Sequence, residues 1–339
     1  SGTSRGVLTT KETYLLEISE NNKKGIGECA IFRGLSYDDV PDYEEKLTWL
    51  CENINLDFEV LKKELLHYPS IIFGLEQALL NLEHGEDLYF PSDFTDGKDS
   101  IKINGLIWMG NADFMQSQIE EKLAKGFDCI KLKIGVDWKS EKEIIKKLRE
   151  KFPKEQLELR VDANGAFSYE EATIVLQELA DLGIHSIEQP IKKSEVRSPK
   201  SEENSEKKST DCCIPWNEMA KLCAETPTPI ALDEELIGII DFEEKKKLLE
   251  TIKPQYIILK PALVGGFSGS DEWIAIAESL GINWWITSAL ESNIGLNAIC
   301  QYTYTKKNPL PQGLGTGALF TNNFETHLQL EGDQMWHKK

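Results

Sequence analysis

The stretch IKLKIG, residues 130–135, places two lysines at alternate positions of an otherwise apolar segment. Alternation with a period of two predicts a buried β-strand in which Lys131 and Lys133 point to the same side. Burying an ammonium group is costly unless a nearby group compensates it. The interpretation of this segment therefore depends on what lies opposite the two lysines.

Strands and helices alternate on both sides of this segment. Eight strand-like segments are predicted, at 101–109, 129–135, 157–165, 185–191, 230–236, 256–263, 283–290 and 313–319. Between them, apolar residues recur at the three- and four-residue spacing of amphipathic helices. This pattern predicts a TIM-type (β/α)7β barrel. A doubly wound open sheet is the alternative, but no G-x-G-x-x-G motif follows the first strand.

Besides the barrel, we predict three further parts of the chain: a capping domain, an insertion and a C-terminal segment. Residues 1–98 read as an α+β capping domain, and the barrel occupies 99–320. A charged, serine-rich segment at 192–210 predicts a solvated insertion in the loop after the fourth strand. We expect the C-terminal segment, 321–339, to return to the cap.

The composition limits the classes of partner. The chain has 57 acidic and 38 basic side chains and a net charge of -19, which argues against binding nucleic acid or an anionic membrane. It has neither a signal-peptide pattern nor an apolar run of about 20 residues, so a cytoplasmic location is expected. Seven scattered cysteines without a C-x-x-C pair predict neither a disulfide framework nor a zinc site.

Three successive strands end in a carboxylate, at Asp162, Glu188 and Asp233. The active site of such a barrel lies at the C-terminal ends of its strands. Three oxygen ligands around one point suit a hard divalent cation, Mg²⁺ or alternatively Mn²⁺, whereas zinc would be expected to recruit His or Cys. Continued alternation directs Glu234 to the helix side of the barrel and Glu235 inward.

Lysines stand on the two flanking strands, Lys131 and Lys133 on the second and Lys260 on the sixth. Closure of a barrel places these strands on opposite sides of its mouth. A lysine can remove the α-proton of a metal-bound carboxylate substrate, because burial and a neighbouring cation favour its neutral form. We expect Lys131 to be that neighbouring charge for Lys133.

Separate salt bridges are the simpler alternative. Asp162 could pair with Lys131, and Glu188 could pair with Arg160, which lies one layer deeper in the predicted strand. Charged residues on five consecutive strands are harder to explain in this way, so one shared site is favoured.

The motifs on these strands resemble those of a known family. They are K-x-K at 131–133, D-A-N at 162–164, E-Q-P at 188–190, D-E at 233–234 and K-P at 260–261, joined by the stretches TSRGVLTTKETYLL, GIGECAIFRGLS and SALESNIGL. Together they resemble the muconate-lactonizing subgroup of the enolase superfamily, and within it they are most similar to the o-succinylbenzoate synthases. The resemblance extends from residue 3 to about residue 318.

This resemblance implies a carbon–oxygen lyase of menaquinone biosynthesis. Its small-molecule carboxylate substrate would be 2-succinyl-6-hydroxy-2,4-cyclohexadiene-1-carboxylate, which loses water to give o-succinylbenzoate. Lys133 would be the acid/base, Lys260 would stabilise the enediolate, and the three carboxylates would hold Mg²⁺, a combination known in this superfamily. Supporting or substrate-binding roles are expected for Lys131, Arg160, Asn164, Ser288 and Arg5.

The resemblance also concerns the cap. Residues 4–6 would belong to a mobile loop, and residues 27–36 to a second loop that shapes the pocket. Family members usually begin with a further strand, so we expect the cap to lack its first strand here.

Two other functions remain open from the sequence. The same residues serve racemases of N-acylamino acids and epimerases of dipeptides, in which each lysine works on one face of the α-carbon. A barrel without catalytic activity, acting as a scaffold, is a third reading. The oligomeric state is left open.

Overall fold

The computed structural model describes residues 2–3, 6–7, 9–193 and 216–338. Its central sheet has seven parallel strands in chain order: β6 (Gly105–Ile107), β7 (Cys129–Lys133), β8 (Glu158–Asp162), β9 (Ser186–Glu188), β10 (Ile230–Leu232), β11 (Tyr256–Leu259) and β12 (Asn283–Ile286). A sheet in which every strand pairs with the next one along the chain is the topology of a barrel. This order confirms the predicted barrel class and excludes the doubly wound alternative.

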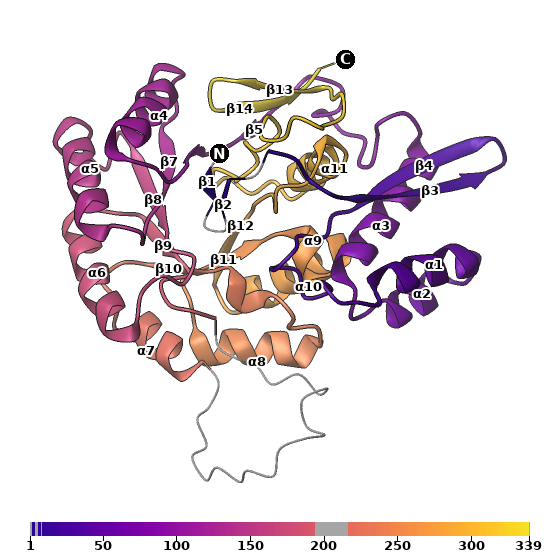
Figure 1. The fold of residues 1–339 in the computed structure, drawn as a ribbon, viewed down its shortest axis with the longest axis horizontal. Helices are drawn as coiled ribbons and strands as arrows, with labels where there is room; N and C mark the ends of the chain where they lie inside the picture. The colour runs from indigo at the N-terminus through magenta and orange to yellow at the C-terminus, as the bar shows by residue number, and fades with distance from the viewer. Residues whose placement is uncertain (1, 4–5, 8, 194–215, 339) are drawn as a thin grey trace, which may run out of the picture.

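Helices connect the strands on the outside of the sheet. They are α4 (Ala112–Ala124), α5 (Trp138–Lys151), α6 (Tyr169–Asp181), α7 (Asn217–Glu225), α8 (Phe242–Ile252), α9 (Pro261–Val264), α10 (Gly266–Ser279) and α11 (Asn293–Thr305). In Figure 1, α4–α8 form an outer arc around the strands. Local signals start several of them: Asp137 caps α5, and Ser168 with Glu171 forms a capping box on α6. None of the described helices has the length and apolar character needed to cross a membrane.

Two predicted strands differ from the structure. The segment 101–109 divides into β5 (Ile101–Lys102), which pairs with β14, and β6, which enters the barrel. Of the segment 313–319, only Gly313 makes a strand contact among the described residues, a bridge to Thr287, and residues 315–318 form a turn. Gly315 and Gly317 weaken a strand at this point. The bridge between Ile103 and Gln312, next to Gly313, still closes the ring.

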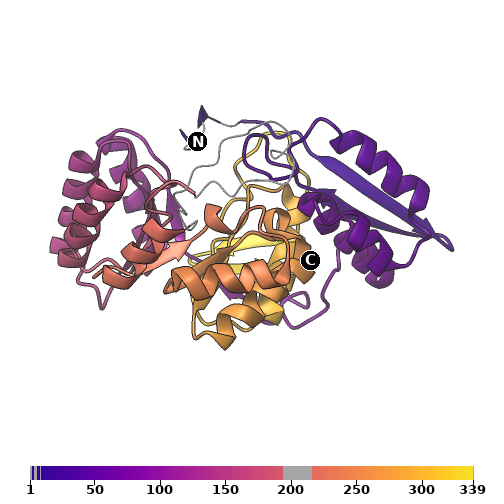
Figure 2. The ribbon, with the colours of Figure 1, turned by 90° about the horizontal axis from the view of Figure 1, so that it is seen from below.

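An N-terminal unit has its own apolar core. Strands β3 (Tyr14–Glu20) and β4 (Lys23–Cys29) form a hairpin that packs on α3 (Pro69–His84), beside α1 (Tyr43–Asn53) and α2 (Phe58–Glu64). A Cβ atom on Gly27 would lie 1.9 Å from the carbonyl oxygen of Gly74, so glycine permits this close contact. Figures 1 and 2 show the unit at one side of the barrel.

The C-terminal segment contacts both the N-terminal part of the chain and the strand that precedes the barrel. Thr321 and Asn322 bond to the backbone of Thr9 and Lys11. The chain then forms the hairpin of β13 (Leu328–Glu331) and β14 (Gln334–His337), which adds to β5 in an antiparallel sheet. A short pair, β1 (Gly2–Thr3) and β2 (Gly6–Val7), begins the described chain. The limits 1–98, 99–320 and 321–339 remain predictions, and most of the 192–210 insertion lies outside the described residues.

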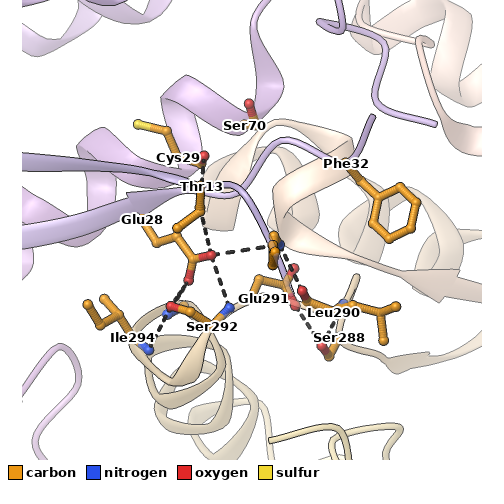
Figure 3. Close-up of polar contacts among 12 residues, drawn as sticks. Thr13, Glu28, Cys29, Phe32, Ser70, Ser288, Leu290, Glu291, Ser292 and Ile294 are labelled. Atoms are coloured by element: carbon orange, nitrogen blue, oxygen red, sulfur yellow. Dashed lines mark hydrogen bonds and ion pairs between the residues drawn. The ribbon is translucent and has the colours of Figure 1, made fainter. Parts of the chain in front are cut away.

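A buried carboxylate of the cap joins it to the barrel. Glu28 on β4 lies at the N-terminus of α11 and accepts hydrogen bonds from Ser292 N (3.0 Å), Ser292 Oγ (2.6 Å) and Gly295 N (2.9 Å). Thr13 Oγ1 donates to it at 2.9 Å, and Lys11 Nζ lies 3.7 Å away (Figure 3). A helix N-terminus attracts negative charge. Glu28 thereby fixes the cap to the barrel directly after the segment Ser288–Glu291.

Glu28→Gln is expected to destabilise the protein, since an amide nitrogen cannot accept the hydrogen bonds that one carboxylate oxygen now accepts. We expect the free energy of unfolding, measured by urea denaturation, to fall by about 1–3 kcal/mol. Glu17→Gln on the same hairpin removes an exposed ion pair with Lys24 and should change it by less than about 0.5 kcal/mol. Equal effects of the two variants would contradict a role of Glu28 in holding the cap.

Candidate active site

Three carboxylates meet at one end of the barrel. Asp162 ends β8, Glu188 ends β9, and the two are paired in register. Glu188 is paired with Ala231 on β10, and Asp233 follows two residues later, on the same face. All three side chains are about 2% exposed. The C-terminal ends of parallel strands thus place these acidic groups next to one another.

Lysines compensate each carboxylate. Lys131 Nζ lies 2.7 Å from Glu188 Oε2 and 3.4 Å from Asp162 Oδ2. Lys133 Nζ lies 2.8 Å from Asp162 Oδ2. From the other side, Lys260 contacts Asp233 and lies 3.9 Å from Glu188 Oε1. The alternative of separate salt bridges predicted a pairing of Asp162 with Lys131. This pairing is present, but it is part of a network that spans five strands.

The network shifts several ionisation equilibria. Burial acts to raise the pKa of Asp162, but Lys133 and Lys131 outweigh it and hold this pKa well below its usual value. Burial and the Asp162 carboxylate raise the pKa of Glu188. Burial acts to lower the pKa of Lys131, yet the Glu188 and Asp162 charges raise it. Lys131 is therefore a buried ammonium next to Lys133.

The donor set fits a hard divalent cation. Carboxylate oxygens are the preferred ligands of Mg²⁺ and Mn²⁺. Glu188 Oε1 is buried and has no hydrogen-bond partner, so an acceptor atom is available for an ion. Among the described residues, the three ligand atoms that lie within 4.8 Å of one another belong to a different group, Asp87, His327 and His337. The three carboxylates at the barrel mouth do not meet this distance, so they would have to move closer together to hold one ion.

A pocket opens above the charged network. Its charged part is formed by Lys131, Lys133, Asp162, Asn164, Glu234 and Lys260, and the rest of its lining comes from Phe32, Leu35, Asn104, Leu106, Trp108, 287–290, Gly313, Gly315 and Thr316. Phe32 and Leu35 belong to the stretch 27–36 that was expected to be a pocket-shaping loop; residues 27–29 lie in β4, and the loop itself follows Cys29. A substrate with a carboxylate at one end and an apolar body matches this division.

Asn164 and Ser288 both line the pocket. Asn164 Oδ1 accepts from Lys133 Nζ at 2.6 Å, and its Nδ2 donates to Glu234 Oε1 at 3.0 Å. Ser288 Oγ donates to Glu291 at 2.6 Å and accepts from Thr316 at 2.9 Å, which holds this hydroxyl in place (Figure 3). Asn164 thus positions the Lys133 side chain, whereas Glu291 and Thr316 hold the Ser288 hydroxyl.

Arg160 lies below the site and outside the pocket lining. It is 1% exposed, donates to Glu158 at 2.7 Å and to the carbonyl of Pro311 at 2.9 Å, and lies over the Trp285 ring at 4.3 Å. The alternative that pairs it with Glu188 is not observed, because Glu158 on the same strand is its partner. Arg5 lies outside the described residues.

Glu234 was expected on the helix side, and this expectation was wrong. The strand ends at Leu232, and residues Glu234–Leu236 form the 3-10 turn η2. Alternation stops where the strand stops, so Glu234 turns into the pocket. Glu235 is instead bonded to Gln189, whose Nε2 donates to it at 3.1 Å. No local signal in the sequence marked this turn.

Comparisons with known proteins agree with this geometry. The family model described as "Enolase C-terminal domain-like" matches residues 115–201 and 211–334. An o-succinylbenzoate synthase of Desulfotalea psychrophila is 42% identical over 98% of this chain and 94% of its own. An N-succinylamino acid racemase of Thermus thermophilus is 33% identical over 86% of this chain and 75% of its own.

Solved structures lead to the same group. The crystal structure of MenC from Desulfotalea psychrophila superposes with a TM-score of 0.82 at 40% identity, covering 96% of this chain and 94% of that one. The resemblance to the enolase superfamily that the strand-end motifs indicated is therefore confirmed, and the chain belongs to the enolase C-terminal domain-like family.

Proposed function

We propose that the protein is an o-succinylbenzoate synthase, a lyase that removes water from 2-succinyl-6-hydroxy-2,4-cyclohexadiene-1-carboxylate. The observation that carries this proposal is the pair of lysines, Lys133 and Lys260, on opposite sides of three buried carboxylates at the floor of one pocket. The relative named for this activity, at 42% identity over 98% of the chain, supports it. The proposal includes menaquinone biosynthesis as the pathway and the cytoplasm as the location, both from the family resemblance.

Lys133 is the acid/base of the reaction. Its neutral amine removes the α-proton at C1 of the substrate, and its ammonium then returns that proton to the hydroxyl leaving C6, so that one water departs and the ring becomes aromatic. Asn164 Oδ1 orients the Lys133 nitrogen, and Lys131, two residues earlier on β7, is bonded to Glu188. Lys260, kept charged by Asp233, faces the enediolate from the other side.

Asp162, Glu188 and Asp233 would hold Mg²⁺, or Mn²⁺ in its place. When bound, the ion supplies the charge that stabilises the enediolate. The apolar part of the lining, including Phe32 and Leu106, excludes water from the substrate carbon that loses its proton.

A racemase or epimerase is the second candidate. The N-succinylamino acid racemase of Thermus thermophilus is 33% identical to this chain. Two lysines on opposite faces also suit 1,1-proton transfer, in which each takes or returns one proton. Dehydration needs one acid/base lysine, so the two functions differ in their dependence on Lys260.

Lys133→Ala is expected to lower kcat for dehydration by about 10²–10⁴-fold, because the general acid/base is lost. Formation of o-succinylbenzoate measures this. Lys125→Ala, which breaks an exposed ion pair with Glu121 on α4, is the matched control and should leave kcat unchanged. Full turnover in the folded Lys133→Ala variant would overturn the assignment of Lys133 as the base, whereas a folded parent protein without turnover would leave the scaffold reading.

Deuterium exchange separates the two candidate functions. In D₂O we expect rapid turnover of the cyclohexadiene substrate and slow incorporation of deuterium into N-succinylamino acids. NMR or mass spectrometry of both substrates measures the ratio. Efficient exchange without dehydration would favour the racemase and overturn the proposal.

Metal removal tests the carboxylate set. EDTA should abolish turnover, and Mg²⁺ should restore it. Glu188→Gln should weaken the affinity for Mg²⁺ because a direct ligand is lost. The loss should exceed the ~10–100-fold that is typical of removing an outer-shell partner. The exposed Glu170→Gln on α6 is the control, and a Mg²⁺ titration of activity gives both values. Activity that survives complete metal removal would contradict the predicted site.

A further inference from the structure

A second group of candidate metal ligands lies away from the barrel mouth. Asp87 stands in the loop after α3, His327 just before β13, and His337 at the end of β14. Asp87 Oδ2 lies 2.6 Å from His327 Nδ1 and 2.9 Å from His337 Nε2, and the three ligand atoms are all within 4.8 Å of one another. Burial acts to raise the pKa of Asp87, but the two histidines outweigh it and hold this pKa well below its usual value, so Asp87 is a carboxylate.

The surrounding structure holds these side chains in place. The carbonyl oxygen of Asp87 accepts hydrogen bonds from Asn297 Nδ2 (2.9 Å) and Gln301 Nε2 (2.8 Å), both on α11. His337 is completely buried and fixed in β14. The side chain of His327 is 46% exposed, so the cluster is open to solvent on one side.

An acceptor atom and an entry path complete the arrangement. Asp87 Oδ1 is buried and has no hydrogen-bond partner. A surface cavity reaches the cluster, and Asp87, Asn297, Glu325 and His327 are among the residues that line it. Glu325 adds a further carboxylate to the rim of that cavity.

We propose that Asp87, His327 and His337 form a second metal site, which binds a divalent transition ion such as Zn²⁺ and ties the C-terminal hairpin to the loop after α3. Two imidazole nitrogens and one carboxylate oxygen are a donor set for zinc, unlike the all-oxygen set at the barrel mouth. Zinc bonds of about 2.0–2.1 Å place neighbouring ligand atoms somewhat over 3 Å apart, so the ligands need to move by less than about 1 Å.

Binding changes the tautomer of both histidines. His327 Nδ1 and His337 Nε2 now donate to the Asp87 carboxylate, and in each imidazole the hydrogen must move to the other ring nitrogen before this nitrogen can bind a metal. The ion would replace two hydrogen bonds by metal–ligand bonds across three segments. The hairpin otherwise pairs with β5 at two residues, Gln334 and Met335, so such a link would strengthen its attachment.

Zinc binding to the full chain tests the proposal. With Mg²⁺ held at saturation, calorimetry should detect one Zn²⁺ per chain, and the melting temperature should rise with Zn²⁺ because the ion binds the folded state. His327→Ala, at an exposed position, should weaken the affinity for Zn²⁺ by at least about tenfold and abolish the rise in melting temperature. His84→Ala, an exposed histidine at the end of α3, is the matched control and should behave like the parent protein.

Three results would overturn the proposal: no Zn²⁺ bound by the folded parent protein, equal affinity in His327→Ala, or equal losses in His84→Ala and His327→Ala. The readouts are affinity and melting temperature, not turnover. Failure here therefore leaves the proposed dehydration untouched, and failure of the dehydration assay leaves this site standing.

Discussion

The mutual compensation of buried charges at the mouth of the barrel is the constraint on which the site depends. Three carboxylates and three lysine side chains lie within a few ångströms of one another at this buried site. An unpaired ion buried there would cost several kcal/mol, so each group is tolerable only beside the others. Parallel strands in register bring them to the same depth, and the resulting field is suited to a cation and to a developing enediolate.

The cap is held by the same kind of compensation. Glu28 on β4 binds the N-terminus of α11, and Glu76 on α3 accepts from the backbone N–H groups of Phe267 and Ser268 at the start of α10. Each buried carboxylate meets the positive end of a helix dipole and several orphan donors. Two such contacts fix the position of the cap, and the loop that carries Phe32 then closes one side of the pocket.

Most of the barrel could be predicted, since alternation and helical periodicity are local properties. The faces of Lys131, Lys133 and Asp162 followed directly from a period of two. Prediction failed where a strand ended early: alternation was carried past Leu232 and misplaced Glu234, and the glycines after Gly313 gave a turn where a strand was expected. Strand ends depend on hydrogen-bond partners that a single segment does not contain.

The sequence by itself determined the class of fold, the strands that carry charge and the chemical type of the residues at their ends. Only the tertiary structure decided which charges pair: Arg160 with Glu158, and Lys131 with Glu188. It alone brought Asp87 beside two histidines at least 240 residues further along the chain. The physical reason is that periodicity sets the direction of a side chain relative to its own backbone, whereas pairing depends on distances between segments, which packing of the whole chain determines.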